Sequence, residues 1–448
     1  MLLVQFVKAR HAPSFQGSPA FSRQVKTATL IRSMPGRQGQ WYCLVMSAQS
    51  DSAISPLAFI ALSIAAFGSG ISQRVADPLL PRFAAEFDVS LGAASWIVTI
   101  FTLGYGFNQL CFGPLGDRFG KYRVIAWSCV ACSLATLLCA LASDFQMLLI
   151  ARLVAGAMLA AIIPLSMAWI GDVVAYEQRQ TVLARFLIGQ ILGVSAGQML
   201  GGLAADYLGW RVPFFMLATG FAAVSVLLFS MQRRLPARAR SVSRVEGHAL
   251  QRLFSEFALV LRQPWARVVT LTVFLEGAFL FGAFAFMASH LHLTHGLSLS
   301  TAGSVVMLFG FGGFLFAACS HFFVRWLGET GLACWGGIAM FVSLLAIALL
   351  PAWWYSLPAC FIAGLGFYML HNTLQTNATQ MAPERRGAAV AAFAFCFFTG
   401  QSAGLALAGA ATENIGTRGI IVAGATGGLL VGLGFARLKA KQRAGGAV

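Results

Sequence analysis

The sequence predicts an all-α membrane protein with twelve transmembrane helices arranged as two parallel six-helix halves. Hydrophobic residues make up 58% of the 448 residues and charged residues only 10%, whereas about a quarter of the residues in a typical soluble domain are charged. The apolar residues fall in long runs, and one sequence pattern occurs twice. A soluble enzyme this apolar could not cover its surface with polar groups, and nucleic-acid binders with a net charge of +16 are less apolar.

The runs have the length that a membrane helix needs, about 20 mainly apolar residues. They are rich in Gly and Ala, as membrane helices are. The alternating strands of about ten residues that form membrane barrels are not seen. The twelve predicted spans are 55–76, 92–112, 124–142, 146–168, 181–205, 213–231, 267–290, 301–323, 332–350, 355–379, 387–411 and 418–437.

The positive charges are distributed unevenly between the predicted loops. If the first span leaves the cytoplasm, the basic residues lie in the cytoplasmic loops after spans 2, 4, 6 and 10 and in the tail, and the opposite loops 290–300 and 351–358 contain no Lys or Arg. Lys and Arg concentrate in cytoplasmic loops. We therefore expect a multi-pass protein of the plasma (inner) membrane with both termini in the cytoplasm, and we expect no nucleic-acid partner.

The chain divides into five predicted regions. Residues 1–50 form a basic N-terminal extension, in which residues 1–45 contain no acidic residue. We interpret it as a disordered tail or a start assigned too far upstream, with Met46 the true first residue, in preference to an organellar transit peptide. The other regions are a six-helix half (51–231), a basic cytoplasmic connector (232–266), a second half (267–440) and a cytoplasmic tail (441–448).

One pattern, E-x-R…G-x-x-x-G…D-x-x-G-x-R, occurs at 177–211 and again 207 residues later at 384–418. The matched pairs are Glu177/Glu384, Arg179/Arg386, Gly193/Gly400, Gly197/Gly404, Gly202/Gly409, Asp206/Glu413, Gly209/Gly416 and Arg211/Arg418. Ser90-Leu91 and Ser298-Leu299 match with a slightly different offset. Parallel halves with a substrate site between them near mid-membrane are a transporter architecture.

The segment 113–123 after span 2 reads Gly-Pro-Leu-Gly-Asp-Arg-Phe-Gly-Lys-Tyr-Arg. Its three glycines, Gly113, Gly116 and Gly120, permit a tight reversal between antiparallel helices. Asp117 can neutralise local charge or cap a helix of the other half. The basic residues Arg118, Lys121 and Arg123 are expected to hold the loop in the cytoplasm.

This segment resembles the G-x-L-a-D-r-x-G-r-k signature of the major facilitator superfamily, in which the loop acts as a latch during alternating access. The resemblance covers residues from about 55 to 440. The equivalent place in the second half (Arg325, Gly328 and Glu329) departs from the signature, so any latch is expected to be asymmetric.

Three further motifs resemble those of the twelve-span drug:proton antiporter and sugar-efflux-permease-like branch. They are the D-x-x-x-P element from Asp77 to Pro81, the R-x-x-x-G element of Arg152 and Gly156, and a glycine-rich span 5. The last contains Gly189, Gly193, Gly197, Gly201 and Gly202. Gln198 stands where that branch has Pro, which bears on the direction of coupling. The glycine series is also explained by close helix packing alone.

Ionisable residues inside spans are functional candidates, because each costs several kcal/mol unless it is paired or hydrated. Asp77 and Arg74 lie near the outer end of span 1, Arg152 in span 4 and Glu276 in span 7. We hypothesise that Asp77 or Glu276 binds a proton and that Arg152 tunes the carboxylate. Alternatively, Asp77 is an interfacial loop residue and Arg152 binds backbone carbonyls. Glu276 is the stronger candidate because no residue near it in sequence can pair with it.

Polar uncharged residues inside spans are candidates for a substrate cavity, since lipid-facing amides are unfavourable. The alternative for each is a hydrogen bond to a neighbouring helix. The candidates are Asn108, Gln109, Gln190, Gln198, His371, Asn372, Gln375 and Gln401. His290, His292 and His295 after span 7 lack an accompanying Cys or acidic residue, and we expect no metal there.

The sequence therefore predicts a secondary active transporter, with proton-coupled efflux of small organic molecules as the leading interpretation. The alternative with the same fold is an uptake symporter or facilitator for a sugar or organic acid. An intramembrane enzyme is less favoured, because no nucleophile–base or metalloprotease motif lies in a span. We expect a monomer without a cofactor, driven by a proton gradient, whose partners are its substrate, protons and the lipid bilayer.

Overall fold

The computed structural model describes residues 56–174, 176–232, 235 and 249–445, and within these all regular elements are helical. The first half contains α4 (Pro56–Arg74), α5 (Leu80–Glu86), α6 (Leu91–Ala94), α7 (Trp96–Phe119), α8 (Lys121–Ala140), α9 (Phe145–Leu159), α10 (Ile162–Val173), α11 (Tyr176–Leu203), the π-helical η2 (Ala204–Leu208) and α12 (Val212–Gln232). The predicted N-terminal extension lies outside the described residues.

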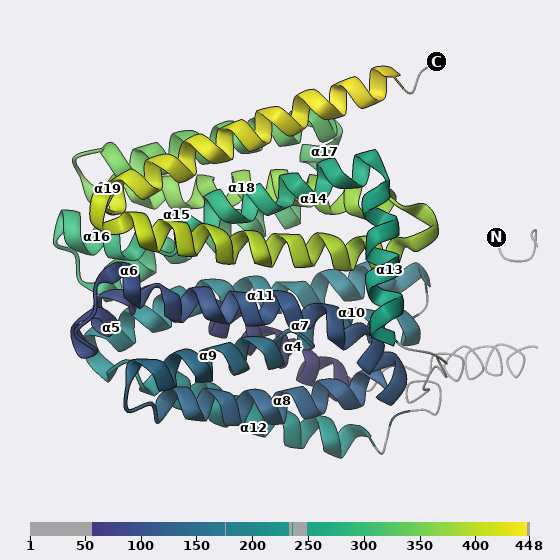
Figure 1. Cartoon of the computed structure of the whole chain (residues 1–448), viewed down its shortest axis with the longest axis horizontal. Helices are drawn as coiled ribbons and strands as arrows, with labels where there is room; N and C mark the ends of the chain where they lie inside the picture. Colours follow the sequence, from purple (N-terminus) through teal and green to yellow (C-terminus); the bar gives the residue numbers. More distant parts are fainter. Residues whose placement is uncertain (1–55, 175, 233–234, 236–248, 446–448) are drawn as a thin grey trace, which may run out of the picture. The chain divides into compact units, whose positions relative to one another are not determined.

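The second half follows an additional amphipathic helix, α13 (Ala249–Arg262), in the predicted connector. It contains α14 (Pro264–Glu276), η4 (Gly277–Phe281), α15 (Gly282–Phe284), α16 (Met287–His295), α17 (Leu299–Leu349), η5 (Trp353–Tyr355), α18 (Ser356–Gln380), η6 (Pro383–Arg385) and α19 (Arg386–Gly445). Figure 1 shows the helices of both halves running between two ends, with α13 at one end and α5, α6 and α16 at the other. We call these the α13 end and the α5 end.

The helices account for the predicted twelve spans. In the part of the chain that the structure describes, nine helices are long and apolar enough to cross a membrane, and the bent pair α5 with α6–α7 makes ten. Two of these, α17 and α19, each contain a residue in the left-handed region, Gly328 (φ 61°) and Gly416 (φ 65°). An α-helix cannot continue through this conformation, so each holds two spans. The all-α fold in twelve spans is confirmed.

The internal repeat is visible in the helix contacts. Gly193 packs on the Phe67 carbonyl of span 1, and 207 residues later Gly400 packs on the Phe274 carbonyl of span 7. With an offset of 208, the turn at Gly120 (φ 89°) has its counterpart at Gly328. The helix cap of Ser90, whose Oγ accepts a hydrogen bond from the Ala93 N–H at 3.1 Å, recurs at Ser298 and Thr301 at 3.2 Å.

Contacts between the halves are dense at the α5 end. Gly92 packs against Gly409, and Gly202 packs against the backbone of Leu299. The Asp206 carboxylate accepts a hydrogen bond from the Ser300 N–H at 2.7 Å. These contacts close the α5 end and fix how spans 2 and 5 meet spans 11 and 8.

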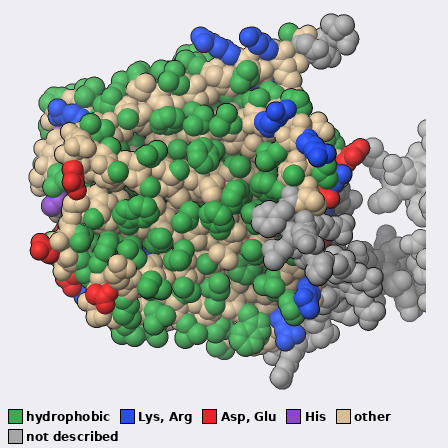
Figure 2. Space-filling model, viewed as in Figure 1, with side chains coloured by type: hydrophobic (Ala, Val, Ile, Leu, Met, Phe, Trp, Pro, Cys, Tyr) green, Lys and Arg blue, Asp and Glu red, His purple; other side chains and the backbone are tan. Residues whose placement is uncertain are grey.

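At the α13 end, the amphipathic helix contacts both α7 and α19. Phe257 of α13 lies 5.7 Å from the ring of Phe395, which also packs on Phe107 of span 2 at 5.3 Å. The Arg385 guanidinium donates to Glu256 at 2.6 Å. Figure 2 shows hydrophobic side chains over the middle of one face, with most Lys and Arg toward the α13 end.

Candidate functional site

The end of span 1 carries a buried charged cluster. The helix α4 ends at Arg74, and a turn containing Pro78 leads to α5. Asp77 lies in this turn and is fully buried. Its Oδ2 accepts a hydrogen bond from Gln198 Nε2 of α11 at 2.9 Å, and it lies 3.7 Å from Arg74 Nη1. The structure therefore joins the two motif residues that the sequence placed separately, in span 1 and span 5.

Arg74 extends this cluster into the second half. Its Nη2 donates to Gln401 Oε1 of α19 at 2.9 Å. Its guanidinium lies over the ring of Phe281, 4.2 Å from the centroid, a favourable cation–π geometry. Arg74 is 3% exposed. It is therefore a charged residue that binds across the interface between the halves.

Arg152 of α9 has a different environment. It is fully buried, and its Nε and Nη1 donate to the carbonyls of Ile97 and Ser72, each at 3.2 Å. Its guanidinium lies 4.0 Å from the ring centroid of Phe101. No ion pair joins it to Asp77 among the residues that the structure covers. These contacts match the backbone-binding alternative, and they connect spans 1, 2 and 4.

Glu276 forms a second buried site, in the other half. It ends α14, is 1% exposed, and its Oε2 lies 2.8 Å from Nδ1 of His371 in α18. The pairing partner is thus remote in sequence, as the lack of a local one suggested. The His371 ring packs on Phe397 and Phe367, with centroids 4.5 Å and 4.9 Å away. A carboxylate and an imidazole therefore share an aromatic environment.

Both sites retain polar atoms without a hydrogen-bond partner. Among the described residues, these include one oxygen of each carboxylate, Asp77 Oδ1 and Glu276 Oε1, together with Gln198 Oε1 and Arg152 Nη2. Buried polar groups are nearly always satisfied, so such exceptions need an explanation. A carboxylate oxygen in this state can accept a proton or a polar group of a ligand.

The remaining cavity candidates lie apart from these two clusters. Asn108 Nδ2 donates to the Gly104 carbonyl of its own helix at 3.1 Å, while Gln109 Oε1 is buried without a partner. Gln190 and Asn372 are half-buried, and Gln375 is exposed. Of the eight candidates, Gln198, Gln401 and His371 therefore contact the buried charges.

The loop motif differs in detail from its expected geometry. Gly113 and Gly116 lie inside α7, and only Gly120 has the left-handed conformation that makes the turn. The Lys121 ammonium donates to Asp172 at the end of α10 at 2.6 Å and lies 3.6 Å from Asp117. Asp117 thus pairs within its own half, and among the described residues it caps no helix of the other half. The expected reversal of the chain needs one glycine, because α7 continues to Phe119.

Two basic residues of the motif lie at the surface. The Arg118 guanidinium packs over the ring of Phe119 at 5.3 Å, and Arg123 is exposed. Both lie at the α13 end.

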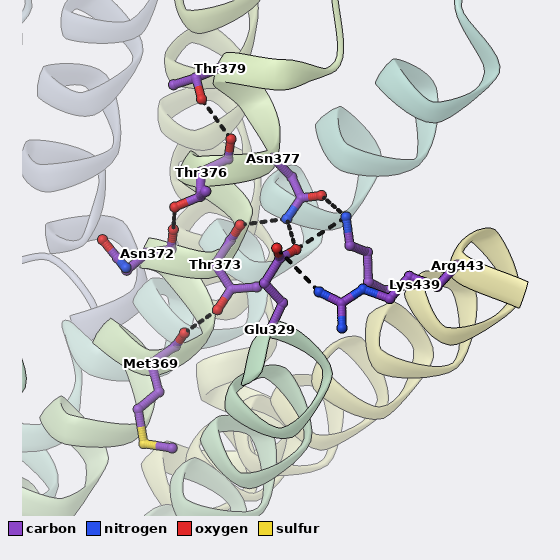
Figure 3. A network of polar contacts seen from close by, with 9 residues as sticks. All are labelled: Glu329, Met369, Asn372, Thr373, Thr376, Asn377, Thr379, Lys439 and Arg443. Carbon is purple, nitrogen blue, oxygen red and sulfur yellow. Dashed lines mark hydrogen bonds and ion pairs between the residues drawn. The ribbon is translucent and has the colours of Figure 1, made fainter. Parts of the chain in front are cut away.

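The second half has its own ion-pair network at the corresponding loop, which the sequence did not reveal (Figure 3). Glu329, the counterpart of Lys121, lies 3.1 Å from Lys439 and 3.3 Å from Arg443, both near the end of α19. Asn377 of α18 bonds to both Glu329 and Lys439. The equivalent positions Lys121 and Glu329 thus have opposite charges. Lys121 pairs with acidic residues, and Glu329 pairs with basic ones.

Electrostatics hold Glu329 in its ionised form. Desolvation favours the neutral acid, but hydrogen bonds from Lys439 and Asn377 and the charges of Lys439 and Arg443 outweigh it, so the pKa of Glu329 lies below its ordinary value. The only sequence signal for this network is the acidic residue directly after Gly328. Its partners are about 50 and 110 residues away, beyond the reach of local patterns.

The glycine series of span 5 lies against span 1 in register. Gly189, Gly193, Gly197 and Gly201 face the carbonyls of residues 63, 67, 71 and 75. Gly202 faces span 8 instead. The two parallel helices therefore approach with backbone against backbone, as small-residue helix packing allows.

Comparison with known proteins agrees with this architecture. The chain is 25% identical over 351 residues to the MFS-type transporter YceJ of Bacillus subtilis, covering 77% of this chain and 86% of the relative. It is 28% identical over 176 residues to the multidrug export protein EmrB of Escherichia coli, covering 39% and 34%.

Solved structures with the same fold include the nucleoside transporter NupG (TM-score 0.68, 12% identity, 84% of this chain and 98% of that one). They also include a bacterial homologue of the lysosomal transporter Spinster (TM-score 0.67, 18% identity, 86% and 96%) in an inward-facing, occupied conformation. The family model of the Major Facilitator Superfamily matches residues 62–405. The chain, with its two repeated halves and buried interface, therefore belongs to the Major Facilitator Superfamily of membrane transporters.

Proposed function

We propose that this protein is a proton-coupled exporter of small, lipophilic organic molecules that works by alternating access. The observation that carries the proposal is the buried carboxylate in each half, Asp77 and Glu276, each with an unpartnered oxygen and a basic neighbour. An ionisable group in a span is costly and therefore functional by default. A carboxylate that can gain and lose a proton there can couple proton movement to a change of conformation.

The interface also supports an apolar substrate. Aromatic side chains from both halves gather between the clusters, including Phe281, Phe367, Phe397 and Phe398 with Tyr105, whose ring lies 4.4 Å from that of Phe398. Ligand sites are lined predominantly by apolar and aromatic groups with a few polar ones. EmrB, similar over part of the chain, is named a multidrug export protein, and radE of Floropilus chiversii an efflux pump.

We further propose that the α13 end faces the cytoplasm of the inner membrane. Most Lys and Arg side chains on the visible face lie toward that end (Figure 2), and cytoplasmic loops are the basic ones. In this orientation the α5 end faces outward, and the backbone contacts of Gly92 with Gly409 and of Gly202 with Leu299 support a state closed to the outside. The proposed unit is a monomer that uses the proton gradient and no bound cofactor.

The proposal is tested by dye accumulation in an efflux-deficient bacterial host. Cells that express the protein should accumulate less of a lipophilic fluorescent dye, and a protonophore should abolish the difference. Glu276→Gln and Asp77→Asn should each lose this export, whereas the exposed Glu413→Gln serves as the matched control and should retain it. Proton-dependent export that survives both carboxylate substitutions would refute the coupling sites. Accumulation that rises with expression would favour the uptake alternative.

A further inference from the structure

We propose that Arg74 is the positioning residue that transmits the ionisation of Asp77 to the closed α5 end. In this role its guanidinium alternates between Gln401 of the opposite half and the Asp77 carboxylate. The inference rests on the proposed proton coupling and adds the group that carries it to the interface. The side chains of Arg74, Asp77, Gln198 and Gln401 form one buried cluster that crosses the two halves.

Arg74 bonds unequally to its two acceptors. Its Nη2 makes a good hydrogen bond to Gln401 at 2.9 Å, but the distance from Nη1 to Asp77 Oδ2 is 3.7 Å, too long for one. Arg74 Nε and Nη1 have no hydrogen-bond partner, and neither has Asp77 Oδ1. Buried donors without a partner thus belong to the residue whose Nη1 lies 3.7 Å from the Asp77 carboxylate, and that carboxylate has an oxygen without a partner.

A proton on Asp77 decides which acceptor the Arg74 guanidinium prefers. An ionised carboxylate accepts a forked pair of bonds from a guanidinium, which is stronger than a bond to a neutral amide. Protonation removes that attraction and leaves Gln401 as the better partner. The observed arrangement, with the short bond to Gln401, is the one expected when Asp77 is neutral.

The Arg74–Gln401 hydrogen bond holds the two halves together. It joins span 1 to span 11, next to the hydrogen bond between Thr102 and Ser402 at 2.9 Å. Breaking it removes a buried contact between the halves and leaves Gln401 without its partner. Protonated Asp77 therefore favours closure of the α5 end, and ionised Asp77 favours its opening.

Other groups around Asp77 do not substitute for Arg74. Gln198 from α11 is neutral and already bonded to Oδ2. Arg152 from α9 acts on Asp77 through its charge, but it is bonded to two carbonyls of its own half. Tyr368 from α18 is a further titratable group that acts on Arg74 electrostatically. Of the charged groups that act on Asp77 in the described chain, Arg74 is the one bonded to the opposite half.

The direction of this effect, in which protonation of Asp77 closes the α5 end, is the one that export requires. A proton taken up from outside would close the α5 end and start the return to the inward-facing state. Loss of that proton to the cytoplasm would allow the α5 end to open again with substrate. Arg74 and Asp77 thus link release of the proton to the change to the outward-facing state.

The test measures opening of the α5 end directly, so that it does not depend on transport. Ser402→Cys is introduced into the full-length chain with its native cysteines replaced. Ser402 is 3% exposed, and Thr102 keeps its bonds to carbonyls of its own helix. A membrane-impermeant maleimide is added outside intact cells at about pH 5.5 and about pH 8, a range in which a buried carboxyl titrates. Rates are normalised to Ser143→Cys in an exposed loop at the same end.

We expect labelling at the higher pH to be faster on the order of tenfold, within the range typical of coupled sites. Asp77→Asn should stay slow at both pH values. Arg74→Gln should be fast at both, alone or combined with Asp77→Asn, and Arg74→Lys should restore part of the pH dependence. Arg82→Gln, which removes an exposed charge paired with Asp206 at 3.7 Å, is the matched control and should behave like wild type.

A pH dependence that survives in Arg74→Gln would overturn the inference, as would labelling of the parent that does not respond to pH. The same data distinguish the proposed role from a purely structural one. If Arg74 were only structural, Arg74→Gln would label faster than the parent but its labelling would still respond to pH. If export proves not to be proton-driven while labelling follows this pattern, the proposed function fails and the switch stands.

Discussion

The close approach of spans 1 and 5 gives a prediction whose size can be worked out from the structure. A Cβ added at Gly70 would lie 2.5 Å from the Gln190 carbonyl oxygen and 2.7 Å from the Val194 nitrogen, both backbone atoms. Ordinary contact begins at 3.4 Å, so Gly70→Ala requires the helices to separate by about 0.9 Å. Overpacking of this kind costs about 1–3 kcal/mol, and the higher helix propensity of Ala returns about 1 kcal/mol.

The matched control is Gly220→Ala. Gly220 is exposed inside α12, and a Cβ there meets nothing within 4 Å, so the substitution should stabilise by up to about 1 kcal/mol. Gly189→Ala, whose Cβ would lie 2.9 Å from the Ser63 oxygen, should fall between the two. The assay is the temperature at which half of the detergent-purified protein remains monodisperse. The net loss expected for Gly70→Ala is therefore up to about 2 kcal/mol. A Gly70→Ala protein that is more stable than wild type, or more stable than Gly220→Ala, would refute the packing argument.

Three further predictions concern polar groups. Arg152→Lys should destabilise the protein by about 2 kcal/mol in thermal unfolding, because one ammonium cannot replace a guanidinium bonded to two carbonyls and stacked on a ring; unchanged stability would argue for a coupling role alone. Folding lowers the pKa of Glu329. The stability that the ionised Glu329 side chain contributes is therefore fully present above the pKa of the unfolded state, about 4.3, and is lost as the pH falls through the pKa of the folded state. Glu329→Gln should therefore unfold at a lower temperature than wild type at neutral pH, and the gap should close in acid; a constant gap contradicts this. The Asp144 carboxylate accepts a bond from the Met147 N–H at 2.8 Å, which lowers its pKa; Asp144→Ala should speed amide exchange at the start of α9, whereas Asp144→Asn, also a good cap, should not.

The fold was predictable from the sequence because its signals are local or periodic. Span-length apolar runs give the helices, and the repeated glycines give the two halves. The buried carboxylates were also found, since a charge in an apolar run is visible without a structure. The helix boundaries were less accurate: α7 extends seven residues beyond the predicted span, which places Gly113 in a helix instead of a turn.

The partners of the charged residues could not be predicted, because they come from other helices. His371 was identified as polar but not as the neighbour of Glu276, 95 residues away. Arg74 was noted at the end of span 1, yet its bond to Gln401 spans 327 residues. Which faces of parallel helices meet depends on packing throughout the bundle, and that information is not contained in any one segment.

The contact between Arg74 and Phe281 has a consequence for how the two halves are related. The two positions are 207 residues apart, the offset of the repeat, so each is the other's equivalent. A residue that touches its own equivalent lies near the pseudo-twofold axis. In a symmetric dimer of identical halves, this position would place arginine against arginine, two buried like charges, or phenylalanine against phenylalanine with no charge. Two halves that differ in sequence, as they do in this chain, can place a cation against an aromatic face there and can thus have one charge switch on the axis.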